Sequence, residues 1–264
     1  MTDGDALVAD HRRLFGEYRS LCRELSDTEW SVRSLCPDWS VRQVVAHAVG
    51  IEQVLLGWTP NLDSPPPFDA MGDLVAASAS MSSGDFGAEV DRILSTREAE
   101  LDRLTAADLT TPSITPVGPG TYGRFLSIRV FDLWVHLRDV RIPLDRPGED
   151  GAHDAETALD EVVRSIGYIV GKRIGLDDGM TIRFDLTGPV CRRIAVAVVD
   201  GRAREVGAET VSAPDVVLST DSTTFLLLAC GRVDPGSRID SGAISWSGDD
   251  EWGERAARSL RFTR

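Results

Sequence analysis

The chain has 264 residues, of which 42% are hydrophobic and 27% charged, proportions that are ordinary for a globular protein with a substantial core. Its formal net charge of −14 argues against nucleic acid and anionic membrane surfaces as partners, because phosphate groups would repel the protein. No apolar run approaches the roughly 20 residues of a membrane span, and the acidic start lacks a signal-peptide pattern, so a cytoplasmic location is expected.

The first half of the chain has the apolar periodicity of helices. Ser40 and Gln43 have the spacing of a capping box, which predicts the start of a helix that carries His47 on its inward stripe. Two stretches rich in Pro, Gly and small residues, 58–84 and 112–120, are expected to be connections. The expected helices cover residues 5–25, 40–55, 85–104 and 122–140. Four helices with one long connection predict a four-helix bundle.

After Pro143 the pattern changes. Residues 147–151 have the composition of a linker, and Asp200-Gly201 predicts a tight hairpin turn. Strands are expected over residues 180–186, 192–199, 202–206, 215–219 and 239–246, with helices over 154–174, 220–230 and 249–260. Mixed strands and helices of this size predict a small α+β domain.

Two short motifs, about 85 residues apart, carry the side chains of greatest chemical interest. One places His47 on the second expected helix; the other places Asp132 and His136 one turn apart on the fourth. Three N/O ligands with an open coordination position are what a catalytic divalent metal requires. Spacing alone equally allows a buried polar network in which Asp132 pairs with Arg129 or Arg97.

The remaining polar residues of these helices carry weaker signals. Glu52 lies five residues beyond His47 and is poorly aligned as a further ligand. Asp139 could orient a metal ligand or could be a surface carboxylate, and the neighbouring Arg138 and Arg141 favour the second interpretation. Trp134 is expected to pack in the core. The four cysteines form no C-x-x-C pair, and we expect them to be reduced and buried with no base beside them.

Three segments resemble a known family. Residues 36–50, CPDWSVRQVVAHAVG, and 131–141, FDLWVHLRDVR, are similar to motifs of the mycothiol-dependent maleylpyruvate isomerase-like family, within the DinB/YfiT-like metal-binding helical bundles. Residues 215–232 resemble the sterol-carrier-like domain fused to that bundle. The resemblance implies a two-domain protein of α plus α/β class, with a DinB-like four-helix bundle at 1–146 and a small α+β sterol-carrier-like domain at 147–264.

The resemblance also implies site residues and cofactors. His47, Asp132 and His136 would hold a divalent metal, most commonly Zn²⁺, with mycothiol as co-substrate and Arg232 as an anion-binding catalytic residue. Characterised isomerases of the family have glutamate where this chain has Asp132, which reaches about one methylene less far. Arg232 is equally well explained as an exposed arginine at a helix end. The arginine bias, with Lys172 the only lysine, is typical of a GC-rich genome and points to an actinobacterial source.

The implied function is thiol-dependent isomerisation of, or transfer to, a small electrophilic metabolite, with the metal favouring the reactive thiolate. The alternative is a non-catalytic two-domain protein that binds a metal or a small molecule. The expected partners are a small-molecule thiol and an electrophile, with no nucleic acid and no membrane. The oligomeric state stays open, a homodimer included.

Overall fold

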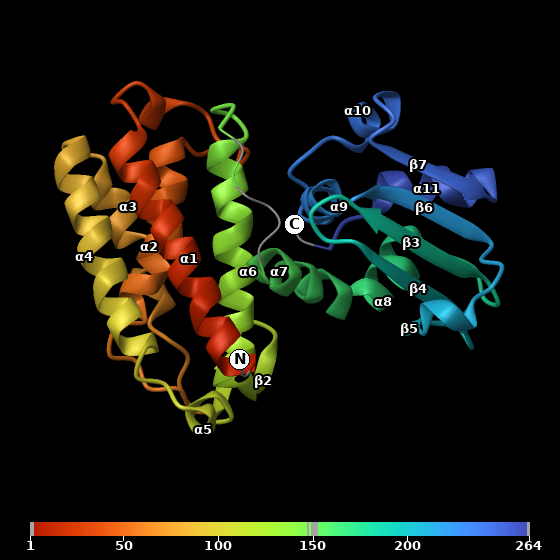
Figure 1. The fold of residues 1–264 in the computed structure, drawn as a ribbon, viewed down its shortest axis with the longest axis horizontal. Coiled ribbons are helices and arrows are strands. Elements are labelled where there is room, and N and C mark those ends of the chain that lie inside the picture. The colour runs from red at the N-terminus through yellow and green to blue at the C-terminus, as the bar shows by residue number, and fades with distance from the viewer. Residues whose placement is uncertain (1–2, 147, 149–152, 263–264) are drawn as a thin grey trace. The chain divides into compact units, whose positions relative to one another are not determined.

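The computed structural model of the chain describes residues 3–146, 148 and 153–262, and it combines helices with a five-stranded sheet (Figure 1). The chain divides into two compact units, residues 1–148 and 149–264. The expectation of a two-domain protein of mixed helix and sheet is confirmed. The linker predicted at 147–151 lies, apart from Gly148, outside the described residues. Across the described residues, every helix is too short or too polar to cross a bilayer.

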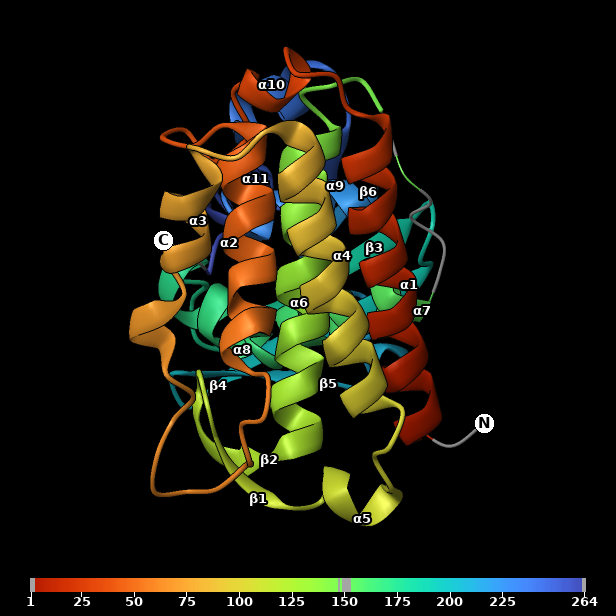
Figure 2. The same ribbon diagram turned by 90° about the vertical axis from the view of Figure 1, so that its left-hand side faces the viewer.

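Four long helices make up the body of the first unit. They lie side by side, with α1 and α2 each packed against both α4 and α6 (Figure 2). Their bounds are α1 (Asp3–Glu24), α2 (Val41–Val54), α4 (Ser83–Leu101) and α6 (Tyr122–Arg141). The facing sides of these helices bury large apolar side chains, among them Tyr18, Val44, Phe86 and Leu133. Burial of these stripes holds the helices together, since isolated helices are only marginally stable in water.

The start of α2 follows directly from the sequence. The side chain of Ser40 accepts a hydrogen bond from the backbone N–H of Gln43, and the side chain of Gln43 accepts one from the backbone N–H of Ser40 at 2.9 Å. The predicted capping box is therefore present. It fixes where the helix begins and thereby which face of α2 carries His47.

The connections of the first unit are more structured than their composition predicts. Residues 58–84 contain η2 (Phe68–Ala70) and α3 (Asp73–Ser78), and α3 packs on α2. Gly50 permits this approach, because a Cβ there would lie 2.7 Å from the carbonyl oxygen of Met71. The loop predicted at 112–120 is instead an antiparallel hairpin of β1 (Pro112–Thr115) and β2 (Gly118–Thr121). The short elements η1 (Glu29–Ser31) and α5 (Ala106–Leu109) complete this unit.

The second unit is built on one sheet, whose strands follow the order β5-β4-β3-β6-β7. Only the β3–β6 pair is parallel. The strands are β3 (Thr181–Thr187), β4 (Arg192–Val199), β5 (Arg202–Val206), β6 (Val216–Asp221) and β7 (Ile244–Gly248). Side chains alternate along β3, with Ile182, Phe184 and Leu186 buried. Helices α9 (Ser222–Ala229) and α11 (Asp250–Ser259) pack against the sheet.

The turn between β4 and β5 is the one that Asp-Gly predicts. Asp200 and Gly201 have φ angles of 52° and 68°, the left-handed conformation required at both positions of a tight hairpin. The antiparallel register of these two strands follows from that turn.

Two predictions for the second unit are wrong in detail. The helix expected over 154–174 is divided into α7 (His153–Arg164), α8 (Ile166–Tyr168) and the π-helical η3 (Ile169–Ile174). The strand expected over 239–246 begins only at residue 244, and α10 (Pro235–Asp240) precedes it. Asp234 caps α10 and Pro235 occupies its first turn, a local signal that outweighs the apolar run. The short η4 (Ala208–Thr210) lies between β5 and β6.

Candidate metal site

Helices α2 and α6 bring the three predicted ligands together. The rings of His47 and His136 lie edge to face with centroids 5.2 Å apart, and His136 Nε2 lies 3.7 Å from Asp132 Oδ1. Neither ring nitrogen of the half-buried His47 has a hydrogen-bond partner among the described residues. The indole of Trp39 packs against the ring of His47 at 4.7 Å. The two imidazoles therefore face each other, and the carboxylate of Asp132 lies beside the ring of His136.

Asp132 also forms an ion pair with an arginine, which is the alternative to a metal that the sequence left open. Its Oδ2 accepts a hydrogen bond from Arg129 Nη1 at 2.6 Å, and its side chain is 32% exposed. The ion pair with Arg129 is thus present, whereas Arg97 does not reach this carboxylate. Oδ1 is left facing His136, so the ion pair and a metal ligand at this position are compatible.

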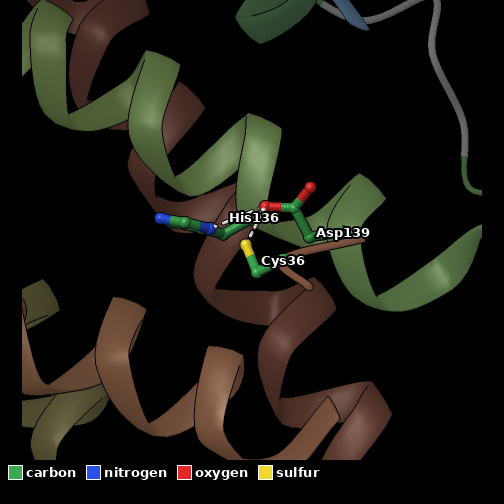
Figure 3. A group of neighbouring side chains, drawn as sticks. All are labelled: Cys36, His136 and Asp139. Atoms are coloured by element: carbon green, nitrogen blue, oxygen red, sulfur yellow. Dashed lines mark hydrogen bonds and ion pairs between the residues drawn. The ribbon is translucent and has the colours of Figure 1, made fainter. Parts of the chain in front are cut away.

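The other ring nitrogen of His136 is held by Asp139 (Figure 3). Nδ1 of His136 donates to Asp139 Oδ2 at 2.9 Å, and the Cys36 thiol donates to the same oxygen at 3.2 Å. Asp139 is 0% exposed, and its backbone carbonyl accepts from the N–H of Leu35 at 3.0 Å. The interpretation of Asp139 as a surface carboxylate is wrong, because the segment before α2 folds over the end of α6 and covers it.

Cys36 corrects a second expectation, that no cysteine has a base beside it. It lies in a group with His136 and Asp139 whose potential ligand atoms are all within 4.8 Å of one another. The remaining cysteines form no disulfide, and Cys191 is exposed, whereas all four were expected to be buried. The spacing of three between His136 and Asp139 could have signalled their contact, whereas nothing in the sequence relates Cys36 to residues 100 positions away.

The charges of the site set the protonation of its groups. Burial alone would lower the pKa of His136, but the charge of Asp132 and the hydrogen bonds with Asp139 and Cys36 outweigh it and raise the pKa to about 10. Burial and the nearby His136 lower the pKa of His47 to about 4. Burial would raise the pKa of Asp132, but His136 and Arg129 hold it below its usual range. The pocket therefore favours a positive charge at Nε2 of His136.

These residues fit a divalent metal on the Nε2 side of His136. His47 is neutral and has no hydrogen-bond partner, Asp132 is ionised, and the surrounding carboxylates favour a cation. A metal there replaces the proton of His136, as metal binding to imidazole requires. On the Nδ1 side, by contrast, Asp139 Oδ2 already accepts two hydrogen bonds in a fully buried position. A hydrogen-bonded carboxylate behind a ligating histidine is a recurrent feature of metal sites.

Family models match both units. The model of the mycothiol maleylpyruvate isomerase N-terminal domain matches residues 11–141, and the model of the C-terminal domain of the same family matches residues 156–255. The chain belongs to the mycothiol maleylpyruvate isomerase family. The resemblance found in the motifs of α2 and α6 is confirmed.

Solved structures with the same fold carry the name of this family. A crystal structure of the mycothiol-dependent maleylpyruvate isomerase is similar with a TM-score of 0.64 and 16% sequence identity, over 99% of this chain and 98% of that one. A histidine-to-alanine mutant of the mycothiol-dependent maleylpyruvate isomerase gives a TM-score of 0.62 and 15% identity over the same shares. No protein of curated function matches in sequence. At this identity the likeness establishes the fold.

The structure also describes three further residues that the sequence brought into consideration. Glu52 is bound by two arginines in the core, so it is not available as a further ligand. Arg232 follows α9 in the second unit, is half-buried, and donates from Nη1 to the carbonyl oxygen of Cys230 at 3.1 Å. Trp134 is fully buried, as expected of a packing residue.

Proposed function

We propose that this chain is a divalent-metal-dependent enzyme that uses a thiol, mycothiol, to isomerise or to modify a small electrophilic metabolite. His47, Asp132 and His136 hold the metal. The observation that carries the proposal is the surroundings of His136: its ring faces the ring of His47, its Nε2 lies 3.7 Å from Asp132 Oδ1, and Asp139 holds its other nitrogen. Similar solved structures are titled mycothiol-dependent maleylpyruvate isomerase, which supports a thiol as co-substrate.

Zinc suits this set of donors best. Imidazole nitrogen and carboxylate oxygen bind Zn²⁺ readily, and three protein ligands with one open position are typical of its catalytic sites. Asp132 is shorter than glutamate, so a metal held by it would have to bind closer to α6 than one held by a glutamate. Elemental analysis of the purified protein identifies the ion.

Each side chain has a defined task in the proposed mechanism. When bound, a divalent metal with an open position lowers the pKa of a coordinated thiol and favours the thiolate. Asp139 accepts the Nδ1 hydrogen of His136, which orients Nε2 toward Asp132 and His47. Trp39 covers one face of His47 and limits access of water there. A thiolate supplied in this way would add to an activated alkene and be expelled again after bond rotation, or would displace a leaving group, which departs with the bonding electrons, and stay attached to the carbon.

We extend the proposal to the two units. Residues 1–146 form a DinB-like metal-binding four-helix bundle, and residues 147–264 a sterol-carrier-like α+β domain. Arg232 of the second domain binds the anionic part of a substrate. The protein acts in the cytoplasm on small molecules. These assignments rest on the motifs of the sequence and on membership of the family.

A non-catalytic binding protein is the competing function, and one observation favours it. Asp132 already has an ion partner in Arg129, so its burial is stabilised without a metal. In that case His136 stays protonated between Asp132 and Asp139, and the two units serve as a binding module.

Metal content separates the two functions. Elemental mass spectrometry of the full-length protein is compared with the His47→Ala/His136→Ala double variant and with His153→Ala, which removes an exposed histidine of the second unit. We expect about one metal per chain in the wild type and in His153→Ala, and none in the double variant. Absence of metal from the wild type after incubation with zinc overturns the metalloenzyme and leaves the binding protein.

Activity provides the second arm of the test. The metal-loaded wild type is assayed with maleylpyruvate and mycothiol, and then with other electrophiles in place of maleylpyruvate. Turnover that needs both the thiol and the metal supports the proposal. A fully loaded protein that consumes none of these electrophiles contradicts an enzymatic role for the site.

A further inference from the structure

A buried ionic network crosses the first unit next to the candidate site. The carboxylate of Glu52 on α2 is 0% exposed and lies between two arginines from different helices. Arg97 Nε on α4 lies 3.2 Å from Glu52 Oε2, and Arg129 Nε on α6 lies 3.0 Å from Glu52 Oε1. The two arginine side chains are 3% and 4% exposed. The network therefore joins three of the four long helices in a dry environment.

The two arginines differ in what else they bind. Arg129 also donates from Nη1 to Asp132 Oδ2 at 2.6 Å and from Nη2 to the carbonyl oxygen of Ala48 at 3.3 Å. Arg97 instead donates to Glu100 at 3.1 Å and to the hydroxyl of Tyr122 at 2.9 Å. Only Arg129 links the core carboxylate to a predicted metal ligand.

We propose that Arg129, anchored by Glu52, is a positioning residue that makes Asp132 a one-oxygen ligand of the metal. The proposal rests on the metal site of the proposed function. Arg129 occupies Oδ2 and leaves Oδ1 facing His136. Because the guanidinium is planar and is held at Glu52 and at the Ala48 carbonyl, it fixes the direction of the bond to Asp132 as well as its length.

The need for such a residue follows from the exposure of Asp132. A carboxylate that is 32% exposed has room to turn toward water or to present both oxygens to a metal. The ion pair with Arg129 removes both options.

The network supplies its own matched control. Arg97 and Arg129 share the partner Glu52 and are equally buried, so that replacement of either by glutamine leaves Glu52 with a single cation. A purely structural network predicts similar effects of both substitutions on the site. A positioning role predicts that only Arg129→Gln changes the affinity for the metal and its coordination by Asp132.

The experiment measures zinc affinity of the full-length protein by competition with a chromophoric chelator, for the wild type, Arg129→Gln and Arg97→Gln. We expect Arg129→Gln to weaken affinity about 10- to 100-fold, the usual effect of removing a partner of a metal ligand, and Arg97→Gln to leave it within about threefold. In the cobalt-substituted proteins, the visible spectrum of Arg129→Gln should change as Asp132 becomes free to bind through both oxygens, while that of Arg97→Gln matches the wild type.

Equal affinities, or equal losses, in the two variants would overturn the positioning role while zinc binding by the wild type still upholds the metal site. A wild type that binds no zinc overturns both. If Arg129→Gln does not fold, Arg129→Lys takes its place. One ammonium cannot reach both carboxylates as the guanidinium does, so we expect a smaller loss in the same direction, and unchanged affinity overturns the proposal.

Discussion

The two units differ in what they bury. Among the described residues, the helical unit buries eight side chains of the acidic, basic and histidine types: Asp10, His11, Glu52, Arg97, Arg129, His136, Arg138 and Asp139. The second unit buries two, Asp154 and Glu161, both on α7, and its sheet packs Phe184 edge-on against Phe225 in an apolar core. Burying a charge is costly unless it is paired, so a core that keeps many of them has been shaped by a requirement other than stability. The comparison supports the proposal that the metal chemistry belongs to the helical unit.

Truncation of the apolar core tests this division with the largest expected effect. Phe184→Ala leaves a cavity where a fully buried ring packs against Phe225, and should lower the free energy of unfolding of the second unit by about 3–5 kcal/mol. Zinc affinity of the first unit should not change. Denaturant unfolding and zinc competition on the same samples measure both quantities. Loss of zinc binding in parallel with stability would show that the division is wrong.

Acid should destabilise the helical unit through His11. Burial lowers the pKa of His11 to about 4, although the charge of Glu52 acts in the opposite direction. Between pH 6.5 and 4 the imidazole of His11 is therefore neutral in the folded protein but takes up a proton in the unfolded chain. Stability attributable to this residue is complete above pH 6.5 and declines toward pH 4, by up to about tenfold in the unfolding equilibrium per pH unit.

The variant His11→Gln should flatten that decline, and the exposed-residue control His153→Gln should not. Unfolding curves at several pH values between 4 and 7 give the slopes. Parallel slopes in all three proteins would mean that other groups account for the acid sensitivity.

Asp139 sharpens the comparison within the site. Asp139→Asn keeps the shape of the side chain but removes the charge that holds Nδ1–H of His136, so zinc affinity should fall about 10- to 100-fold. Asp154→Asn, at a buried carboxylate of the second unit, is the control and should leave affinity unchanged. Chelator competition at pH 7 measures each. If the two substitutions have the same effect, the special role of Asp139 is refuted.

The smallest effect is expected at the start of α2. Ser40→Ala removes the capping side chain and should cost about 1 kcal/mol of stability, as should Ser82→Ala at the start of α4. Because α2 carries His47, only Ser40→Ala should also reduce zinc affinity, by a factor of a few. Equal zinc affinities of the two variants would show that the capping of α2 has no effect on the metal site.

Local signals allowed the sequence to predict much of this structure. The capping box at Ser40, the Asp-Gly hairpin and the helical spacing of Asp132 and His136 each depend on residues at most four apart. The hairpin of β1 and β2 was missed because its Pro and Gly residues are equally typical of an irregular loop. The π-helical segment η3 was missed because helical periodicity does not indicate where a helix changes to the rare π form.

The parts of the site that were missed depend on distant packing. The contact of Cys36 with Asp139 exists only because the segment before α2 folds back on α6, where Leu35 bonds to the Asp139 carbonyl. Helical spacing predicts Arg129 as a partner of Asp132, but it does not predict the contact of Arg129 with Glu52, because Glu52 lies on another helix 77 residues away. Helical periodicity predicts which residues share a face and is silent about which faces meet.

The contact between Trp39 and His47 gives the molecule a built-in optical probe. Of the four tryptophans in the helical unit, Trp30 and Trp134 are buried in the core and Trp58 packs against Tyr122 and Phe125. The half-buried indole of Trp39 instead lies 4.7 Å from the imidazole that is proposed to bind the metal. Indole emission depends on the polarity and charge of its immediate surroundings. A metal ion bound to that imidazole is therefore expected to change the emission of Trp39, so that binding can be followed in real time without a label.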